Sequence, residues 1–163
     1  GKSTLARRLA KELNGVVLSK DEVRAALFPP PVLAYSREQD DICMDAIFNA
    51  AACILRADPQ QAVILDGRTF LRSYQIQDLL KVAASVNQPP LLIECVSDDE
   101  VAKGRLDHDL AVSTHPAGNR TFELYLSLKA QAEPIGIPHL VLDTGKLDLE
   151  ECVRQAVMYV QGR

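Results

Sequence analysis

Four short apolar runs alternate with longer helical segments along the chain, and this alternation limits the possible folds more than any other feature. The runs are 16–18, 62–65, 91–96 and 139–142. Each is too short for a typical helix and nearly free of polar side chains, as expected of strands buried on both faces of a parallel sheet. Strands that alternate with helices predict an α/β fold, in which helices cover both faces of a parallel sheet.

The helices are predicted from the spacing of apolar residues and from side chains that can cap a helix start. The predicted helices are 4–13, 20–28, 36–57, 73–85, 97–110, 120–133 and 149–160. Capping interactions are predicted at four of the starts, by Ser19 with Glu22, Ser36 with Gln39, Ser97 with Glu100, and Asp148 with Glu151.

The length and composition suit one globular domain, which we take as 1–163. A net charge of −4 argues against a broad nucleic-acid surface, although a local basic groove stays open. No apolar run approaches the length of a membrane span. The four cysteines are scattered and form no Cys-x-x-Cys pair, which favours buried free thiols in a reducing, cytoplasmic compartment over a metal site.

The chain begins with Gly1-Lys2-Ser3-Thr4, which matches the last four positions of a Walker A phosphate-binding loop, G-x-x-x-x-G-K-S/T. In such a loop, backbone N–H groups and the positive end of the next helix hold the phosphates. Lys2 would reach the β- and γ-phosphates, Ser3 would bind Mg²⁺, and Thr4 would start the helix. The first half of the motif and its strand are expected before residue 1. So short a match is also compatible with a simple helix cap.

The ends of the predicted strands carry the other candidate residues, because ligands of open α/β sheets bind at the carboxyl ends of the strands. Asp21 follows the first apolar run, and Arg24 lies one helical turn further on. A kinase needs a carboxylate that orients and deprotonates the attacking hydroxyl, and a guanidinium that can hold an anionic acceptor. Alternatively, Asp21 only complements the helix dipole and pairs with Arg24.

Asp66 ends the second apolar run, where a Walker B carboxylate would hold Mg²⁺ through water. The alternative is a plain Asp-Gly turn. Arg68 and Arg72 follow within reach of the same edge, so either could bind an acceptor, although exposed arginines are common.

A segment around 105–120 is predicted to form a lid over the phosphates. Arg105 precedes a stretch broken by Pro116 and Gly118, and Arg120 follows it. Mobile lids of phosphotransferases use such arginines to cover phosphates and exclude water. Thr144, after the last apolar run, could line the nucleotide site or simply form a turn.

These features resemble the P-loop kinases of the AAA_33 type, which are related to polynucleotide 5′-kinase, zeta toxin and adenylylsulfate kinase. The matching segments follow the same order over nearly the whole chain. They are Gly1-Lys-Ser-Thr4, Leu18-Ser-Lys-Asp-Glu-Val-Arg24, Leu65-Asp-Gly-Arg-Thr-Phe70, Ile93-Glu-Cys95, Arg105-Leu106, Glu133-Pro-Ile135 and Leu142-Asp-Thr144.

The resemblance implies roles for three residues. Asp21 would be the catalytic base, Arg24 would contact an acceptor phosphate, and Arg105 would enter the lid near the nucleotide. Where relatives often carry a second lid arginine, this chain has His108 and Asp109, so Arg120 is the remaining candidate.

The resemblance also implies a three-layer α/β/α P-loop fold with strand order 2-3-1-4-5. Strand 1, in the middle, would be the one expected before residue 1.

The predicted function is phosphorylation, with ATP and Mg²⁺, of a hydroxyl on a small molecule or nucleotide. The alternative enzyme is a polynucleotide 5′-kinase. The net negative charge of the chain argues against this alternative, because binding a nucleic-acid strand requires several phosphates to be neutralised. A regulatory module that binds ATP without an acceptor is the non-catalytic alternative. No Asn-Lys-x-Asp guanine-reading motif is found in the sequence, so a GTPase is less favoured.

Overall fold

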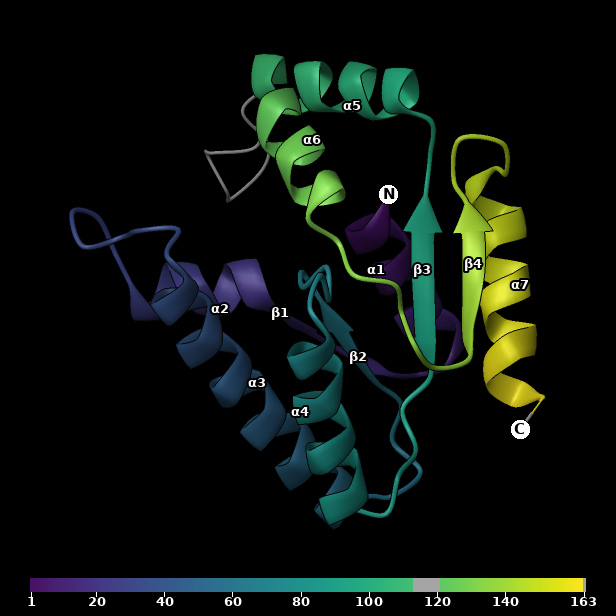
Figure 1. Cartoon of the computed structure of the whole chain (residues 1–163). Coiled ribbons are helices and arrows are strands. Elements are labelled where there is room, and N and C mark those ends of the chain that lie inside the picture. Colours follow the sequence, from purple (N-terminus) through teal and green to yellow (C-terminus); the bar gives the residue numbers. More distant parts are fainter. Residues whose placement is uncertain (113–120, 163) are drawn as a thin grey trace.

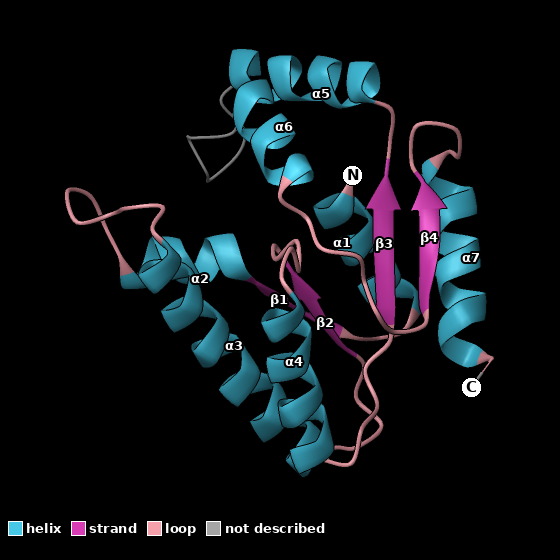
Figure 2. Ribbon diagram, viewed as in Figure 1, coloured by secondary structure: helices cyan, strands magenta, loops and turns pink. Residues whose placement is uncertain are grey.

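The computed structural model describes residues 1–112 and 121–162, in which helices and strands alternate as predicted (Figures 1 and 2). The helices are α1 (Lys2–Glu12), α2 (Lys20–Leu27), α3 (Arg37–Ala57), α4 (Ser73–Ser85), α5 (Asp99–Val112), α6 (Phe122–Ala130) and α7 (Leu149–Gln161). The strands are β1 (Val16–Ser19), β2 (Val63–Asp66), β3 (Leu92–Val96) and β4 (His139–Asp143). None of the helices described is both long and apolar enough to cross a bilayer.

The strands form two parallel pairs. Strand β1 pairs with β2, with Ser19 opposite Asp66, and β3 pairs with β4, with Val96 opposite Asp143. These are the neighbours that the predicted order requires for the four strands present. The parallel α/β architecture is therefore confirmed.

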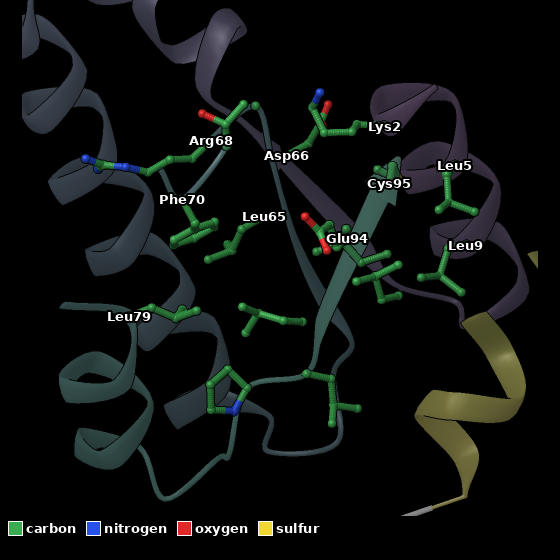
Figure 3. A pocket seen from close by; sticks show the side chains of 18 of the residues that line it. Lys2, Leu5, Leu9, Leu65, Asp66, Arg68, Phe70, Leu79, Glu94 and Cys95 are labelled. Atoms are coloured by element: carbon green, nitrogen blue, oxygen red, sulfur yellow. The ribbon is translucent and has the colours of Figure 1, made fainter. Parts of the chain in front are cut away.

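Between the two pairs lies a cavity of about 810 Å³, lined largely by apolar side chains of α1, β2, β3 and α4 (Figure 3). In the part of the chain that the structure describes, β2 and β3 belong to separate two-stranded sheets. The predicted order would place a further strand between them, and that strand remains a prediction.

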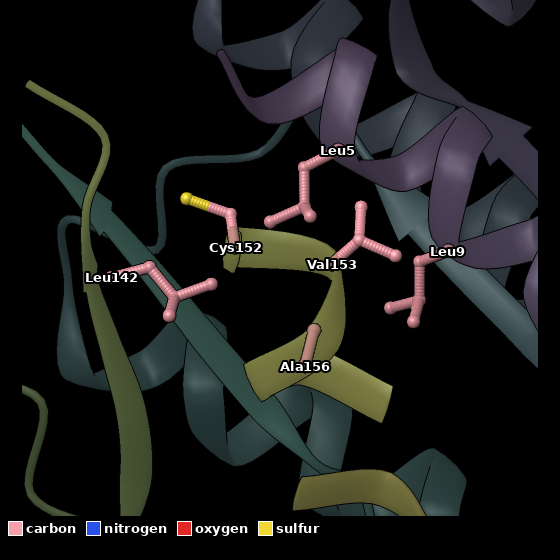
Figure 4. Packing of buried hydrophobic residues seen from close by; sticks show 6 residues of the cluster. All are labelled: Leu5, Leu9, Leu142, Cys152, Val153 and Ala156. Atoms are coloured by element: carbon pink, nitrogen blue, oxygen red, sulfur yellow. The ribbon is translucent and has the colours of Figure 1, made fainter. Parts of the chain in front are cut away.

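Two apolar cores lie on opposite faces of the strands, which gives the three layers. On one face, Leu5 and Leu9 of α1 and Leu142 of β4 pack against α7 (Figure 4). On the other, side chains of α3 and α4 pack against β3. Because successive strand residues point to opposite faces, Ile64 joins the first core and Leu65 the second.

Three of the four predicted capping interactions are confirmed. Ser19 Oγ accepts a hydrogen bond from the Glu22 amide at 3.4 Å, Ser36 Oγ from Gln39 at 3.2 Å, and Asp148 Oδ1 from Glu151 at 2.8 Å.

Several predicted helix boundaries were wrong, and the structure gives a cause for three of them. Helix α1 begins at Lys2 rather than Thr4, since the Gly1 carbonyl already accepts from the Leu5 amide at 3.0 Å. Helix α5 begins at Asp99, and the Asp98 carbonyl accepts its first amide, so Ser97 cannot cap it with Glu100. Helix α6 ends at Ala130 because Glu133 leaves it to bind the start of α4: its amide donates to Leu71 O at 2.9 Å.

Candidate functional site

The carboxyl ends of the strands bring several predicted residues to one edge of the fold. In Figure 1 the N-terminus lies beside the arrowheads of β3 and β4. A Cβ built on Gly1 would stand 3.6 Å from the Thr144 side chain. The start of α1 and the loop after β4 are therefore in contact, although they lie at opposite ends of the sequence.

The N-terminus of α1 differs from the starts of α2, α3 and α7. Those helices each have a side chain that caps the first turn, and acidic residues within it. Helix α1 has Gly1 before it, no side-chain cap and no acidic residue in its first turn. Its first amide groups and the positive end of its dipole are thus suited to an anion such as a phosphate.

Arg105 of α5 reaches this edge and is held by Thr144. Its Nη1 donates to Thr144 Oγ1 at 2.9 Å, and its Nη2 donates to the Thr144 carbonyl at 2.6 Å. Thr144 is itself anchored, because its amide donates to Val96 O at 2.8 Å. Gly1, Arg105 and Thr144, all predicted to bind the nucleotide, therefore lie together.

Asp66 ends β2, is 9% exposed, and lines the cavity together with Lys2. Figure 3 shows both side chains at the same end of the cavity. The chain then turns at Gly67, whose φ is 103° and whose Cβ position would lie 3.0 Å from the Lys20 Cβ. A residue with a side chain would be strained there.

These residues fit a bound nucleotide and Mg²⁺. The uncapped start of α1 and the ammonium of Lys2 suit phosphates, while the half-buried Ser3 and the Asp66 carboxylate could act as oxygen ligands for the metal. Within the described residues, no group of three or more His, Cys, Asp or Glu side chains could hold a metal ion. Phosphate oxygens and water would have to complete the coordination.

A second group of charged residues lies at the β1–β2 end of the site, and we call it the α2–α3 charge cluster. It consists of Lys20, Asp21, Arg24, Asp40, Asp41 and Arg68.

Asp40, in the first turn of α3, joins two cations of α2. Lys20 Nζ donates to its two oxygens at 3.0 and 3.2 Å, and Arg24 Nη2 forms an ion pair with it. Arg24 Nη1 also pairs with Asp21 Oδ1 at 3.5 Å. Asp21 therefore does pair with Arg24, and this contact is compatible with both the functional and the structural interpretation of Asp21.

Arg68 closes the cluster from the loop after β2. Its Nη2 donates to Asp41 Oδ1 at 2.9 Å, and Figure 3 shows its side chain directed toward a neighbouring helix and away from Lys2. Because Arg68 and Gly67 line the cavity and Gly67 contacts Lys20, the cluster borders the cavity that contains Lys2 and Asp66.

The cations of this cluster are buried. Arg24 is 5% exposed, its guanidinium lies 5.4 Å from the centre of the Tyr35 ring, and the Nε–H groups of Arg24 and Arg68 have no acceptor among the described residues. Burial, and then the charge of Arg24, lower the pKa of Lys20 to about 8.

Two other predicted residues lie apart from this cluster or outside the described part of the chain. Arg72 precedes α4 and binds the segment after α6, with Nη1 3.5 Å from Glu133 Oε1 and Nη2 3.2 Å from Gln131 Oε1. Arg120, and most of the predicted lid beyond Arg105, lie outside the described residues.

Sequence reasoning missed Lys20, Asp40 and Asp41. Acidic residues near the start of a helix are common because they complement its dipole, so Asp40, in the first turn of α3, and Asp41 beside it carried no special signal. The contacts of Asp40 depend on the packing of α3 against α2, and that of Asp41 depends on the loop after β2. No local pattern encodes either arrangement.

Residues 1–114 match the AAA_33 family, described as an AAA domain. The fold resembles the crystal structure of a candidate kinase from Chloroflexus aurantiacus J-10-fl, with 21% identity, a TM-score of 0.73, and coverage of 98% of this chain and 91% of that one. It also resembles an unliganded sugar kinase from Janibacter sp. HTCC2649, with 20% identity, a TM-score of 0.63, and coverage of 99% and 88%. No curated protein matches the chain.

Proposed function

Because the chain belongs to the AAA_33 family, we propose that it is an ATP-dependent kinase that phosphorylates a hydroxyl group of a small molecule or nucleotide. The observation that carries the proposal is the contact between the uncapped start of α1, Thr144 and Arg105, at the end of the cavity that Asp66 and Lys2 line. The two solved structures compared above are described as a candidate kinase and a sugar kinase, which supports the same class of reaction.

The nucleotide end would bind the phosphates of ATP. Backbone amides of α1 would donate to phosphate oxygens, and Lys2 would contact the β- and γ-phosphates. Ser3 and Asp66 would hold Mg²⁺, which neutralises phosphate charge when it is bound. Arg105, fixed by Thr144, would add a positive charge beside the same phosphates, and Arg120 would supply a second one from the lid.

At the acceptor end, Asp21 would act on the attacking hydroxyl. A new bond forms between the acceptor oxygen and the γ-phosphorus, the bond from that phosphorus to the β-phosphate oxygen breaks, and ADP leaves. The hydroxyl proton passes to the Asp21 carboxylate. Arg24, 3.5 Å from Asp21, would keep that carboxylate oriented, and Arg68 and Arg72 would contact the acceptor.

The test is transfer of label from γ-labelled ATP, with Mg²⁺, to a panel of hydroxyl acceptors. Lys2→Ala should abolish transfer and weaken ATP binding. The matched control is Lys11→Ala, an exposed lysine in the same helix, which should leave both unchanged.

Two other outcomes would contradict the proposal. ATP binding without transfer to any acceptor would indicate a regulatory nucleotide-binding module. Equal ATP binding by the wild type and Lys2→Ala would contradict the assignment of the phosphate site.

A further inference from the structure

The α2–α3 charge cluster carries information about the acceptor, because its cations and carboxylates are not equally accessible. The side chains of Arg24, Arg68 and Lys20 are only 6%, 7% and 11% exposed. Their carboxylate partners are more open: the exposed fractions are 22% for Asp21, 30% for Asp40 and 42% for Asp41. A molecule that approaches the cluster from solvent therefore meets carboxylate oxygens before it meets cations.

The charges of the cluster also balance. Each cation lies at ion-pair distance from at least one of the three carboxylates, and Asp40 serves both Lys20 and Arg24. An anionic acceptor would have to displace one of these carboxylates, which would leave it partly buried and without its cation. This arrangement disfavours the acceptor phosphate that the family resemblance assigns to Arg24.

A hydroxyl group suits the same surroundings. It can donate a hydrogen bond to a carboxylate oxygen and can accept one from a guanidinium. The more exposed side chains of the cluster are its carboxylates, so hydroxyl donors match them without adding charge.

We propose that the acceptor is an uncharged molecule rich in hydroxyl groups, such as a sugar or another polyol, whose hydroxyls donate to Asp21, Asp40 and Asp41. This inference rests on the proposed kinase function. In it, Asp40 is a specificity-determining residue, because it pairs with both Lys20 and Arg24 and so weakens the positive charge that would attract an anion.

The experiment compares neutral acceptors with their anionic counterparts: glycerol with glycerol 3-phosphate, and glucose with gluconate and glucose 6-phosphate. Label transfer from γ-labelled ATP gives kcat/KM for each. The wild type should prefer the neutral member of a pair by about tenfold or more. Preference for the anionic members would overturn the inference and leave the kinase function standing.

Asp40→Asn should shift this preference, since it leaves Lys20 and Arg24 with one carboxylate fewer. We expect the ratio of neutral to anionic kcat/KM to fall at least fivefold, and inorganic sulfate to become a better competitive inhibitor. The matched control is Asp45→Asn, an exposed aspartate of the same helix, which should leave the ratio unchanged.

Asp41→Asn provides a second variant in case Asp40→Asn does not fold, because Asp41 is more exposed and its loss frees Arg68. An unchanged ratio in the folded variants would overturn the inference. ATP binding with no transfer to any acceptor of either kind would contradict the kinase function, and this inference with it.

Discussion

The two ends of the site hold their arginines in opposite ways. At the nucleotide end, Arg105 is exposed and bound to neutral oxygens of Thr144. At the acceptor end, Arg24 and Arg68 are buried, and each is paired with a carboxylate.

The positive charge of Arg105 is still available to a bound ligand, whereas the charges of Arg24 and Arg68 are already neutralised by carboxylates. A guanidinium held by a hydroxyl and a carbonyl keeps its full positive charge for a phosphate ligand. One held between carboxylates mainly stabilises the packing of α2 on α3 and orients Asp21. From the sequence alone, each of these arginines is a candidate to bind a ligand. Their partners in the structure divide them into those bound to neutral oxygens and those paired with carboxylates.

The largest effect should follow from removing Arg24. Arg24→Ala removes the buried cation that pairs with both Asp21 and Asp40, and breaking a buried pair in this way costs roughly 3–5 kcal/mol. Urea unfolding would measure the loss, with Arg56→Ala, an exposed arginine of α3, as the control. If the free energy of unfolding fell by less than about 1 kcal/mol, as for a surface ion pair, Arg24 would contribute no more to stability than an exposed arginine does.

Lys20 should make stability depend on pH. Its pKa is about 8 in the folded protein, below its ordinary value of 10.5, so between these pH values the unfolded chain binds the additional proton. The free energy of unfolding should therefore rise with pH across this window, by roughly 1–3 kcal/mol.

The measurement is the difference in pH dependence between the wild type and Lys20→Met, which should lack this rise. Lys81→Met is the control, because that lysine is exposed and pairs with Asp78 of its own helix. Parallel profiles for the wild type and Lys20→Met would show that Lys20 does not titrate in this window.

Arg105→Ala should weaken ATP binding by about tenfold, close to 1.4 kcal/mol, with little loss of stability because the side chain is exposed. Thr144→Ala removes the hydroxyl that accepts from Arg105 Nη1, while the backbone carbonyl of residue 144 still accepts from Nη2. In a double-mutant cycle the two effects on ATP affinity should therefore not add. Full additivity would mean that Thr144 does not position Arg105.

The smallest effect is expected at Arg72. Its pairs with Gln131 and Glu133 are at the surface, so Arg72→Ala should change the free energy of unfolding by less than about 1 kcal/mol. Kinetics with the best acceptor would decide whether Arg72 contacts it, since only a contact would raise KM.

The fold could be predicted because its signals are local and consistent. Short apolar runs, Gly and Pro stops and capping serines such as Ser19 and Ser36 all point to the same alternation of strands and helices. Among the boundaries that failed, the end of α6 depends on a tertiary contact, because Glu133 binds the start of α4.

The meeting of Gly1 and Thr144 could also be predicted, since strand ends in a parallel sheet converge on one edge, while their binding of a nucleotide stays a prediction. Gly1, Arg105 and Thr144 lie together as that rule requires. The partners of Arg24 and Lys20 were not predictable, because Asp40 reaches them only through the packing of α3 on α2.

The most direct test of the account measures ATP affinity and single-turnover transfer together, in the wild type and in Asp21→Asn. Glu22→Gln, an exposed neighbour in the same turn, is the control. We expect Asp21→Asn to bind ATP within about twofold of the wild type and to lose about 100-fold or more in transfer rate, the contribution typical of a positioned base. Undiminished transfer in Asp21→Asn would contradict the division of the site into a nucleotide end and an acceptor end.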